Sequence, residues 1–360
     1  MIKYLGSKRR LLPILEAMAE RSGATSMLDL FAGTTLVGQS FKRHRARVTA
    51  VDTASYSKVL GETFISIDAT SANLRELDDA VDHLNRIPGS AGYFTENFSI
   101  RARYIQPFNG ERIDAIRECI ARDYAGSWLE APLLASLLRA ADMVDSTTGV
   151  QMAFLKEWSR RSFKPLELVS PTLLPGDGET IQADALNLLP KLPMVDLAYI
   201  DPPYNQHRYF GNYHVWESLI RWDKPETYGV ANKRVDVRDE ANRSAFNSKV
   251  TMPDALKTVL REVQAETIIL SYNNESWLGV DELIAELAPR GEVRVIDVDF
   301  KRYVGSQIGI YNKSGEKVGS PGARRNLEHL IVAGPSKLIE LLCPKGDLNP
   351  YPLMRTSTSS

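Results

Sequence analysis

Short apolar runs alternate with amphipathic stretches along most of this 360-residue chain. The apolar runs are rich in aliphatic and β-branched residues, so we predict six strands, at residues 27–31, 48–52, 195–200, 267–271, 293–300 and 327–332. Helical periodicity predicts helices at residues 11–20, 253–263 and 280–287. Alternating strands and helices indicate an α/β fold with a mostly parallel sheet, and such sheets bind ligands beyond the carboxyl ends of their strands.

The interval between the second and third predicted strands has a different pattern. Its apolar positions follow a helical period, which predicts helices at residues 73–85, 112–122, 131–144 and 151–160. A segment rich in proline and glycine, residues 170–178, then returns the chain to the sheet. We therefore predict a catalytic α/β domain from residues 1–60 and 169–355, a mainly helical insert at residues 61–168, and a disordered tail at residues 356–360.

Composition excludes several classes of protein. The first residues lack the apolar core of a signal peptide, and no stretch approaches the roughly 18 apolar residues of a membrane span, so we expect a soluble cytoplasmic protein without a membrane partner. Two widely separated cysteines, Cys119 and Cys343, indicate neither a disulfide framework nor a Cys-rich zinc site. No metal is expected.

Charge is distributed unevenly along the chain. The net charge of -1 argues against a globally basic nucleic-acid binder, but residues 1–60 carry ten basic and four acidic side chains. This asymmetry suits a face that meets phosphates. For the basic residues between positions 42 and 47, a solvated helix surface is an equally good explanation.

The third predicted strand runs directly into Asp201-Pro202-Pro203-Tyr204. The carboxylate accepts hydrogen bonds, the prolines fix φ, and the ring offers a face for stacking. A planar amino group on a flat ring fits such a rigid group of side chains. The structural alternative is a Pro-Pro turn with an incidental acid and tyrosine.

A second motif follows the first predicted strand. Phe31-Ala32-Gly33-Thr34-Thr35 is a small-residue turn in which Gly33 permits close approach of a ligand to the backbone. The next strand ends at Asp52, about 20 residues further on, where an acid can bind ribose hydroxyls in Rossmann-like sites. The glycine spacing is not that of a dehydrogenase, and no Walker lysine is present. These features favour a nucleoside ligand without a phosphate chain.

Taken in their order along the chain, the motifs resemble those of adenine-specific DNA methyltransferases of the D12 class, the group that includes the Dam-like enzymes. The resemblance is carried by Lys3-Tyr4-Leu5-Gly6-Ser7-Lys8, Phe31-Ala32-Gly33, Asp201-Pro202-Pro203-Tyr204, Asn212-Tyr213-His214 and Ser271-Tyr272-Asn273. It spans nearly the whole chain. It implies a Rossmann-like S-adenosylmethionine-dependent methyltransferase sheet in which the helical insert is a target-recognition module.

The resemblance also implies a reaction, methyl transfer to the exocyclic amine of adenine. This amine is a poor nucleophile because its lone pair is delocalised into the ring, so an enzyme must supply hydrogen-bond acceptors for its N–H groups. The resemblance assigns the catalytic role to Asp201, Pro202, Pro203 and Tyr204. The Asp201 carboxylate and the Pro202 carbonyl would accept hydrogen bonds from the amine, while Tyr204 stacks on an adenine flipped out of the duplex. A Pro-Cys nucleophile, as cytosine C5 methylation requires, does not occur in the sequence.

For the cofactor S-adenosylmethionine, the resemblance implies a site formed by Tyr4, Lys8, Phe31, Gly33, Asp52 and Asp201. Asp184, after a short strand, is a candidate acceptor for the adenine amine of the cofactor. Each assignment has a structural alternative: Lys8 as a surface charge, Phe31 as a core residue, and Asp184 as a helix N-cap.

Double-stranded DNA is the expected partner, and a restriction endonuclease of the same system is a candidate second partner. We assign DNA contacts to the helical insert and to the polar segment 206–250, which we interpret as a loop that orders over DNA. The candidate phosphate contacts in that segment are Lys233, Arg234, Arg238 and Arg243. A solvated loop balanced by neighbouring acids is the alternative. A monomer or weak dimer is expected.

Two other functions remain open at this level. One is methylation of another planar amine, cytosine N4 or adenine in RNA. The other is a sequence-specific DNA-binding protein that keeps the fold without turnover.

Overall fold

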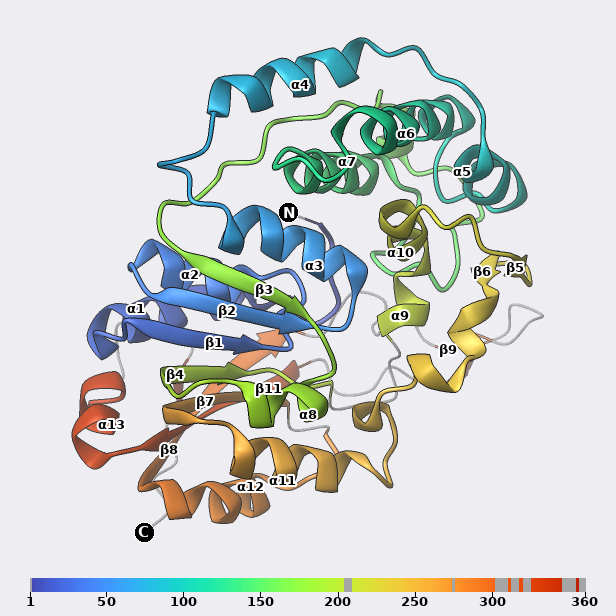
Figure 1. Ribbon diagram of the computed structural model, residues 1–360. Helices are drawn as coiled ribbons and strands as arrows, with labels where there is room; N and C mark the ends of the chain where they lie inside the picture. Colours follow the sequence, from blue (N-terminus) through green and yellow to red (C-terminus); the bar gives the residue numbers. More distant parts are fainter. Residues whose placement is uncertain are drawn as a thin grey trace. The chain divides into compact units, whose positions relative to one another are not determined.

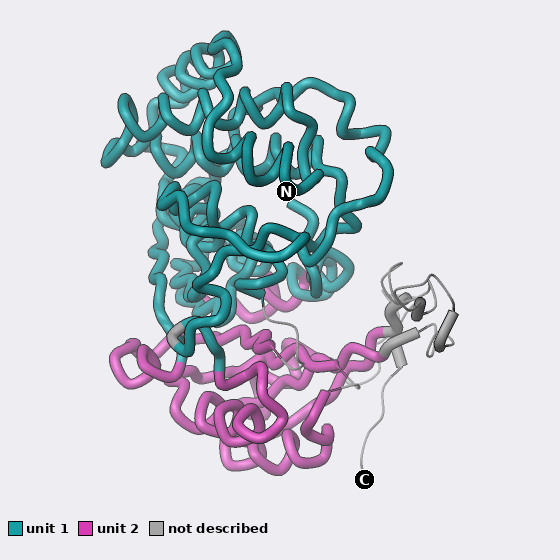
Figure 2. Tube along the Cα trace, turned by 90° about the vertical axis from the view of Figure 1, so that its right-hand side faces the viewer, with its two compact units in different colours: residues 1–16, 25–185, 207–244 teal, residues 17–24, 186–206, 245–360 magenta. Residues whose placement is uncertain are grey.

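The computed structural model describes residues 2–203, 209–273, 276–301, 310–311, 317–319, 325–344 and 354–355. The chain divides into two compact units, shown in Figure 2. Unit 1 comprises residues 1–16, 25–185 and 207–244, and unit 2 comprises residues 17–24, 186–206 and 245–360. The predicted tail at residues 356–360 lies outside the described residues.

Unit 1 combines a small parallel sheet with most of the helices of the chain (Figure 1). Its elements are the 3-10 helix Lys8–Arg10, β1 (Ser26–Leu30), α2 (Leu36–Arg43), β2 (Arg47–Asp52), α3 (Ser55–Gly61), α4 (Leu74–Arg86), α5 (Tyr93–Thr95), α6 (Pro107–Cys119), α7 (Glu130–Val144), β3 (Gly178–Gln182), α9 (Tyr209–Asn212), α10 (His214–Arg221), β5 (Thr227–Tyr228) and β6 (Lys233–Arg234). Three π-helical segments, Glu62–Ser66, Glu96–Arg101 and Ile120–Tyr124, and the 3-10 helices Arg160–Phe163, Val235–Arg238 and Glu240–Asn242 complete it. Helix α1 (Leu12–Ser22) contributes residues to both units.

The strands of unit 1 pair in the order β1-β2-β3, and both pairs are parallel. Helices α2 and α3 pack against these strands. The predicted strands at residues 27–31 and 48–52 are confirmed, since β1 is displaced by one residue and β2 begins one residue earlier.

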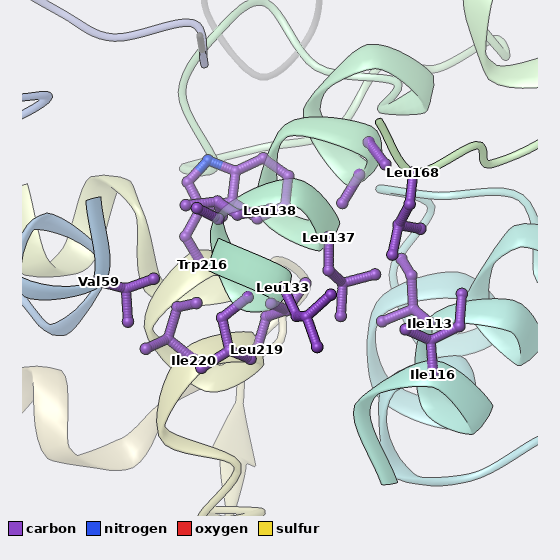
Figure 3. Close-up of a cluster of buried hydrophobic side chains, with 14 of the residues drawn as sticks. Val59, Ile113, Ile116, Leu133, Leu137, Leu138, Leu168, Trp216, Leu219 and Ile220 are labelled. Carbon is purple, nitrogen blue, oxygen red and sulfur yellow. The ribbon is translucent and has the colours of Figure 1, made fainter. Parts of the chain in front are cut away.

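The helical part of unit 1 has a shared apolar core. Ile113 and Ile116 of α6 and Leu133, Leu137 and Leu138 of α7 belong to one buried cluster, which also contains Trp216, Leu219 and Ile220 of α10 (Figure 3). The three residues of α10 follow the i, i+3, i+4 spacing that places side chains on one face of a helix. The helices at residues 61–168 are therefore packed with a helix from residues 207–244, within one compact unit.

One predicted helix is absent. Residues 151–159 form turns, bends and irregular segments, and only Arg160 is helical, as the first residue of the 3-10 helix Arg160–Phe163. The Gln151 side chain accepts hydrogen bonds from the backbone N–H groups of Val215 and Trp216 (3.0 and 3.3 Å), and Arg103 donates to the carbonyl of Leu155 (3.4 Å). These long-range bonds replace a helical ladder, which is a tertiary effect that periodicity does not reveal.

Unit 2 contains the remaining strands. Its elements are α8 (Ala185–Leu188), which begins at the last residue of unit 1, the 3-10 helix Leu189–Lys191, β4 (Val195–Ile200), the 3-10 helix Ala245–Asn247, α11 (Met252–Glu262), β7 (Ala265–Asn273), α12 (Val280–Leu287), the 3-10 helix Ala288–Arg290, β8 (Glu292–Lys301), β9 (Ile310–Tyr311), β10 (Lys317–Gly319), β11 (Arg325–Gly334), α13 (Ser336–Leu342) and β12 (Met354–Arg355). The other four predicted strands correspond to β4, β7, β8 and β11, so they are confirmed.

Strand direction in unit 2 agrees with a mostly parallel sheet. β4 and β7 are parallel, whereas β11 lies antiparallel to both β7 and β8. β7 and β8 therefore run in the same direction, and β11 and the two-residue β12 are reversed. The reversed β11 is the feature that the alternating pattern did not indicate. The α/β class predicted from the sequence is confirmed.

Candidate active site

The carboxyl ends of β1, β2 and β3 lie side by side in unit 1. Leu30 is in register with Val51, and Asp52 is in register with Gln182. The turn that begins at Phe31, the carboxylate of Asp52 and the residues after Gln182 therefore share one edge of the sheet. Asp184 comes two residues after β3, and the N–H of the preceding Ala183 donates to the Asp52 carbonyl (3.0 Å).

The turn after β1 has an unusual backbone. Phe31, Gly33 and Thr35 all have positive φ, at 67°, 51° and 58°. For the two residues with side chains this conformation costs on the order of 1 kcal/mol each. The turn is held by Asp29, which is 1% exposed and accepts a 2.8 Å hydrogen bond from the Gly38 N–H in α2. Strain that is fixed by buried hydrogen bonds is characteristic of ligand-binding loops.

Asp52 is the second anchor of this turn. One carboxylate oxygen accepts a hydrogen bond from the Gly33 N–H (2.8 Å), and the other accepts from the Ala54 N–H (2.9 Å). Burial raises the pKa of Asp52, although hydrogen bonds from Ala54 and Gly33 oppose this shift. The half-buried side chain thus joins the turn to the start of α3 at the strand end.

Tyr4 covers Gly33. A Cβ atom placed on Gly33 would lie 3.0 Å from Cε1 of the Tyr4 ring, so a larger residue would force the ring to move. The Tyr4 ring stacks on Tyr213 with centroids 5.0 Å apart at 15°, and on Tyr209 at 5.4 Å and 29°. Its hydroxyl lies 3.5 Å from that of Tyr56, and burial raises the pKa of Tyr4.

Three of these tyrosines were not predicted as site residues. Tyr56, Tyr209 and Tyr213 surround the predicted Tyr4, but they lie in stretches whose sequence carries no ligand-binding pattern. Tyr213 was noted only as part of the family resemblance. Its hydroxyl accepts a 2.6 Å hydrogen bond from the Leu5 N–H.

The structure also decides between the alternative roles predicted for Lys8 and Phe31. Lys8 is 7% exposed and begins the 3-10 helix Lys8–Arg10, so it is not a surface charge. Phe31 is only half-buried, which differs from a core residue, and it occupies the strained turn. Asp184 is half-buried directly before α8, which is compatible with either of its proposed roles.

Glu217 is a buried acid that the sequence did not single out. It is 1% exposed, and it accepts a 2.8 Å hydrogen bond from the Ser55 N–H at the start of α3. Burial raises the pKa of Glu217 from 4.5 to about 7, while hydrogen bonds from Ser55 and the charges of Arg221 and Arg234 act in the opposite direction.

In unit 2, Asp201 follows β4 directly. Asp201 is half-buried, Pro202 is buried and Pro203 is half-buried, whereas Tyr204 lies outside the described residues. β4 pairs with β7, with Ile200 in register with Leu270, so Asp201 lies at the strand edge where β7 continues into Ser271 and Tyr272. The Ser271 hydroxyl donates to Glu328 (2.7 Å).

The four predicted phosphate contacts have different environments. Arg234 is 0% exposed and forms ion pairs with Asp223 (2.6 Å) and Asp236 (2.7 Å), which raise its pKa. The prediction that Arg234 contacts phosphate is wrong in this conformation, because its guanidinium is already paired and buried. Arg238 is exposed and lies 3.7 Å from the Tyr228 ring centroid, the exposed Arg243 pairs with Glu240 at 3.5 Å, and Lys233 is half-buried.

The interpretation of residues 206–250 as one polar loop is also wrong for its first part. Residues 209–221 form α9 and α10, and the side chains of α10 are mostly buried. The apolar spacing of Trp216, Leu219 and Ile220 was the available signal for this helix. Within the described part of the chain, no group of three or more His, Cys, Asp or Glu side chains is arranged to hold a metal, and no helix is long and apolar enough to span a membrane.

The acids at adjacent strand ends of this α/β fold lie where such sheets bind ligands, and Asp-Pro-Pro-Tyr follows another strand. The family model of the D12 class N6 adenine-specific DNA methyltransferases matches residues 4–284. The chain belongs to this family, and the resemblance inferred from its motifs is confirmed.

Individual relatives agree with the family model. Type II methyltransferase M.NlaIII of Neisseria lactamica is 30% identical over 318 residues, covering 84% of this chain and 92% of that protein. Type II methyltransferase M.CviAII of Paramecium bursaria Chlorella virus 1 is 31% identical over 316 residues, with 84% and 92% covered. Type II methyltransferase M.FokI of Planomicrobium okeanokoites is 28% identical over 328 residues, covering 84% of this chain and 50% of that protein.

Proposed function

We propose that the protein transfers a methyl group from S-adenosylmethionine to the N6 amine of adenine at a specific site in duplex DNA, with the base flipped into the Asp201-Pro202-Pro203-Tyr204 loop. The proposal rests on family membership together with one observation. An Asp-Pro-Pro-Tyr sequence follows a buried strand, and the proteins that share its order of motifs are DNA methyltransferases.

The residues of unit 1 fit S-adenosylmethionine. Asp52 and Asp184 place carboxylates at adjacent strand ends, beside the turn in which Gly33 packs against the Tyr4 ring. We propose that Asp52 accepts hydrogen bonds from the ribose hydroxyls and Asp184 from the adenine amine, while Tyr4, Lys8 and Phe31 complete the site. When bound, the cofactor supplies an electrophilic methyl group.

The remaining chemistry belongs to the protein. The Asp201 carboxylate and the Pro202 carbonyl would accept the two N–H groups of the target amine and so localise its lone pair for attack. Asp201 would also stabilise the positive charge that develops on nitrogen, and it would take up the proton released by the methylated amine or pass it to water. Holding the amine in line with the methyl group supplies rate acceleration through positioning.

DNA recognition is assigned to the helices at residues 61–168 and to the exposed cations after α10. Arg238 and Arg243 stay as candidate phosphate contacts, with the half-buried Lys233 beside them. A cognate restriction endonuclease is a proposed partner, since the relatives are type II methyltransferases and modification methylases.

The proposal is tested by incubating the chain with duplex DNA and S-adenosylmethionine that carries a labelled methyl group, followed by nucleoside mass spectrometry. We expect N6-methyladenine in DNA. N4-methylcytosine, or label found only in RNA, would select the other substrates, and DNA binding without label transfer would select the non-catalytic alternative.

The variant Asp201→Ala tests the proposed role of the Asp201 carboxylate as the acceptor for the target amine. It should abolish methyl transfer, because the amine loses its charged acceptor, while affinity for duplex DNA is retained. Asp254→Ala, at the exposed start of α11, is a control that removes a carboxylate within the same unit and should keep wild-type turnover. Near wild-type turnover of Asp201→Ala at saturating cofactor and DNA would refute the assigned role.

A further inference from the structure

Helix α10 contacts the candidate cofactor site at two points one helical turn apart. Tyr213 precedes the helix and Glu217 lies in its first turn, and the Glu217 N–H donates to the Tyr213 carbonyl (3.0 Å). Both side chains are buried, at 0% and 1% exposure. The proposed transfer reaction assigns no role to either residue.

The first contact holds the N-terminal segment. The Tyr213 hydroxyl accepts the Leu5 N–H at 2.6 Å, and its ring stacks on Tyr4 at 5.0 Å and 15°. Tyr4 in turn lies against Gly33, in the strained turn after β1. Tyr213 therefore fixes both the backbone and the ring of the segment that covers the turn.

The second contact holds the start of α3. Glu217 accepts the Ser55 N–H at 2.8 Å, and the preceding residue, Ala54, donates its N–H to Asp52 at 2.9 Å. Two consecutive backbone N–H groups thus point at two carboxylates, one from α10 and one from β2. Moving Ser55 moves the peptide that orients Asp52, whose other oxygen holds Gly33.

The same region is tied to β3. Gln182, in register with Asp52, donates its side-chain amide to the Thr53 carbonyl (2.9 Å) and to the Ser55 hydroxyl (3.2 Å). Ser55 is therefore positioned by α10 from one side and by β3 from the other.

We infer that Tyr213 and Glu217 are positioning residues for the S-adenosylmethionine site, acting through Tyr4 and Asp52 respectively. This inference rests on the proposed function. It assigns the helix that follows the Asp-Pro-Pro-Tyr loop in the sequence to the organisation of the cofactor site rather than to DNA contact.

The experiment measures the Kd of S-adenosylmethionine by calorimetry for four variants of the full chain. Tyr213→Phe removes only the hydroxyl, so the ring stack persists while the partly buried Leu5 N–H loses its acceptor. Glu217→Ala removes the acceptor for Ser55, whereas Glu217→Gln keeps an oxygen at that position. Tyr93→Phe is the matched control, because its partly buried hydroxyl donates to the Pro225 carbonyl (2.5 Å) elsewhere in unit 1.

We expect Tyr213→Phe and Glu217→Ala to raise this Kd about tenfold, because a partly buried N–H loses its hydrogen-bond acceptor in each variant. Glu217→Gln should restore most of the affinity. In turnover assays the KM for S-adenosylmethionine should rise, while kcat and the KM for DNA stay within twofold of wild type. Tyr93→Phe should lower the Tm without changing the Kd.

Two results would overturn the inference. One is a Kd within twofold of wild type for both Tyr213→Phe and Glu217→Ala; the other is an equal loss of affinity in Tyr93→Phe, which would indicate general destabilisation. A wild-type chain that binds no S-adenosylmethionine would instead refute the proposed function, and this inference with it.

Discussion

Replacing Gly33 with alanine should damage the cofactor site through a single added carbon. Gly33 has φ of 51°, a conformation that costs a residue with a Cβ about 1 kcal/mol. The new Cβ would also lie 3.0 Å from Cε1 and 3.3 Å from Cζ of Tyr4. Carbon atoms prefer separations of about 3.5 to 4.0 Å, so the ring must move by roughly half an ångström.

The Tyr4 ring has little freedom to move, because it stacks on both Tyr209 and Tyr213 and the adjacent Leu5 N–H donates to the Tyr213 hydroxyl. Overpacking of this kind costs about 1 to 3 kcal/mol. We therefore expect Gly33→Ala to lower the free energy of unfolding by about 2 to 4 kcal/mol, and to weaken S-adenosylmethionine binding about tenfold or more.

The variant Gly126→Ala separates the cost of the backbone conformation from the cost of the contact with Tyr4. Gly126 lies in the same unit with φ of 73°, and a Cβ there would meet nothing within 4 Å. It should lose only the backbone contribution of about 1 kcal/mol in denaturant unfolding and keep wild-type cofactor affinity in calorimetry. In the double variant Tyr4→Ala/Gly33→Ala the steric part of the loss should vanish. Equal unfolding losses in Gly33→Ala and Gly126→Ala, with unchanged cofactor binding in both, would refute the reasoning.

Three other predictions concern charged side chains. Asp52→Ala should weaken S-adenosylmethionine binding by about 1 to 3 kcal/mol in calorimetric titration and leave cofactor-free DNA affinity unchanged; equal cofactor affinity would contradict the placement of Asp52. Arg234→Ala should lower the free energy of unfolding by about 2 to 4 kcal/mol, because Asp223 and Asp236 lose a buried partner. The double variant Arg238→Ala/Arg243→Ala should instead keep its stability and lower the salt slope of DNA binding by about 0.9 per lost contact. An unaltered salt slope would move the DNA-contacting surface elsewhere. The pKa of Glu217 is raised to about 7, so between pH 4.5 and 7 the folded chain keeps a proton that the unfolded chain releases. The free energy of unfolding of the wild type should therefore fall by up to about 3 kcal/mol as the pH rises through this range. Glu217→Gln should remove this dependence, and a pH profile of stability identical to wild type would contradict the assignment.

The elements that could be predicted from the sequence are those with a local signal. The strands at residues 48–52 and 195–200 are predominantly apolar runs, and the sequence places Asp52 at the end of the first and Asp201 directly after the second. Strand ends are informative because parallel pairing brings them to one edge, whatever the rest of the chain does.

The residues that escaped prediction depend on long-range contacts. Arg234 has the same local sequence signal as Arg238, but in the folded chain it is buried and forms ion pairs with Asp223 and Asp236. Glu217 is a charged residue in an amphipathic helix, and only the fold reveals that it faces the Ser55 N–H. The helix expected at residues 151–160 failed for the same reason, since the Gln151 side chain binds backbone 64 residues away.

The discontinuous course of unit 1 has a consequence for how the chain folds during synthesis. The core between α3, α6 and α7 receives Trp216, Leu219 and Ile220 from the third stretch of chain (Figure 3). Translation adds about 5 to 20 residues each second, so the helices at residues 61–168 emerge from the ribosome seconds before α10 can cover their apolar faces. A nascent chain arrested near residue 185 should therefore expose Leu133 and Leu137, and such a chain is a substrate for chaperones and prone to aggregation.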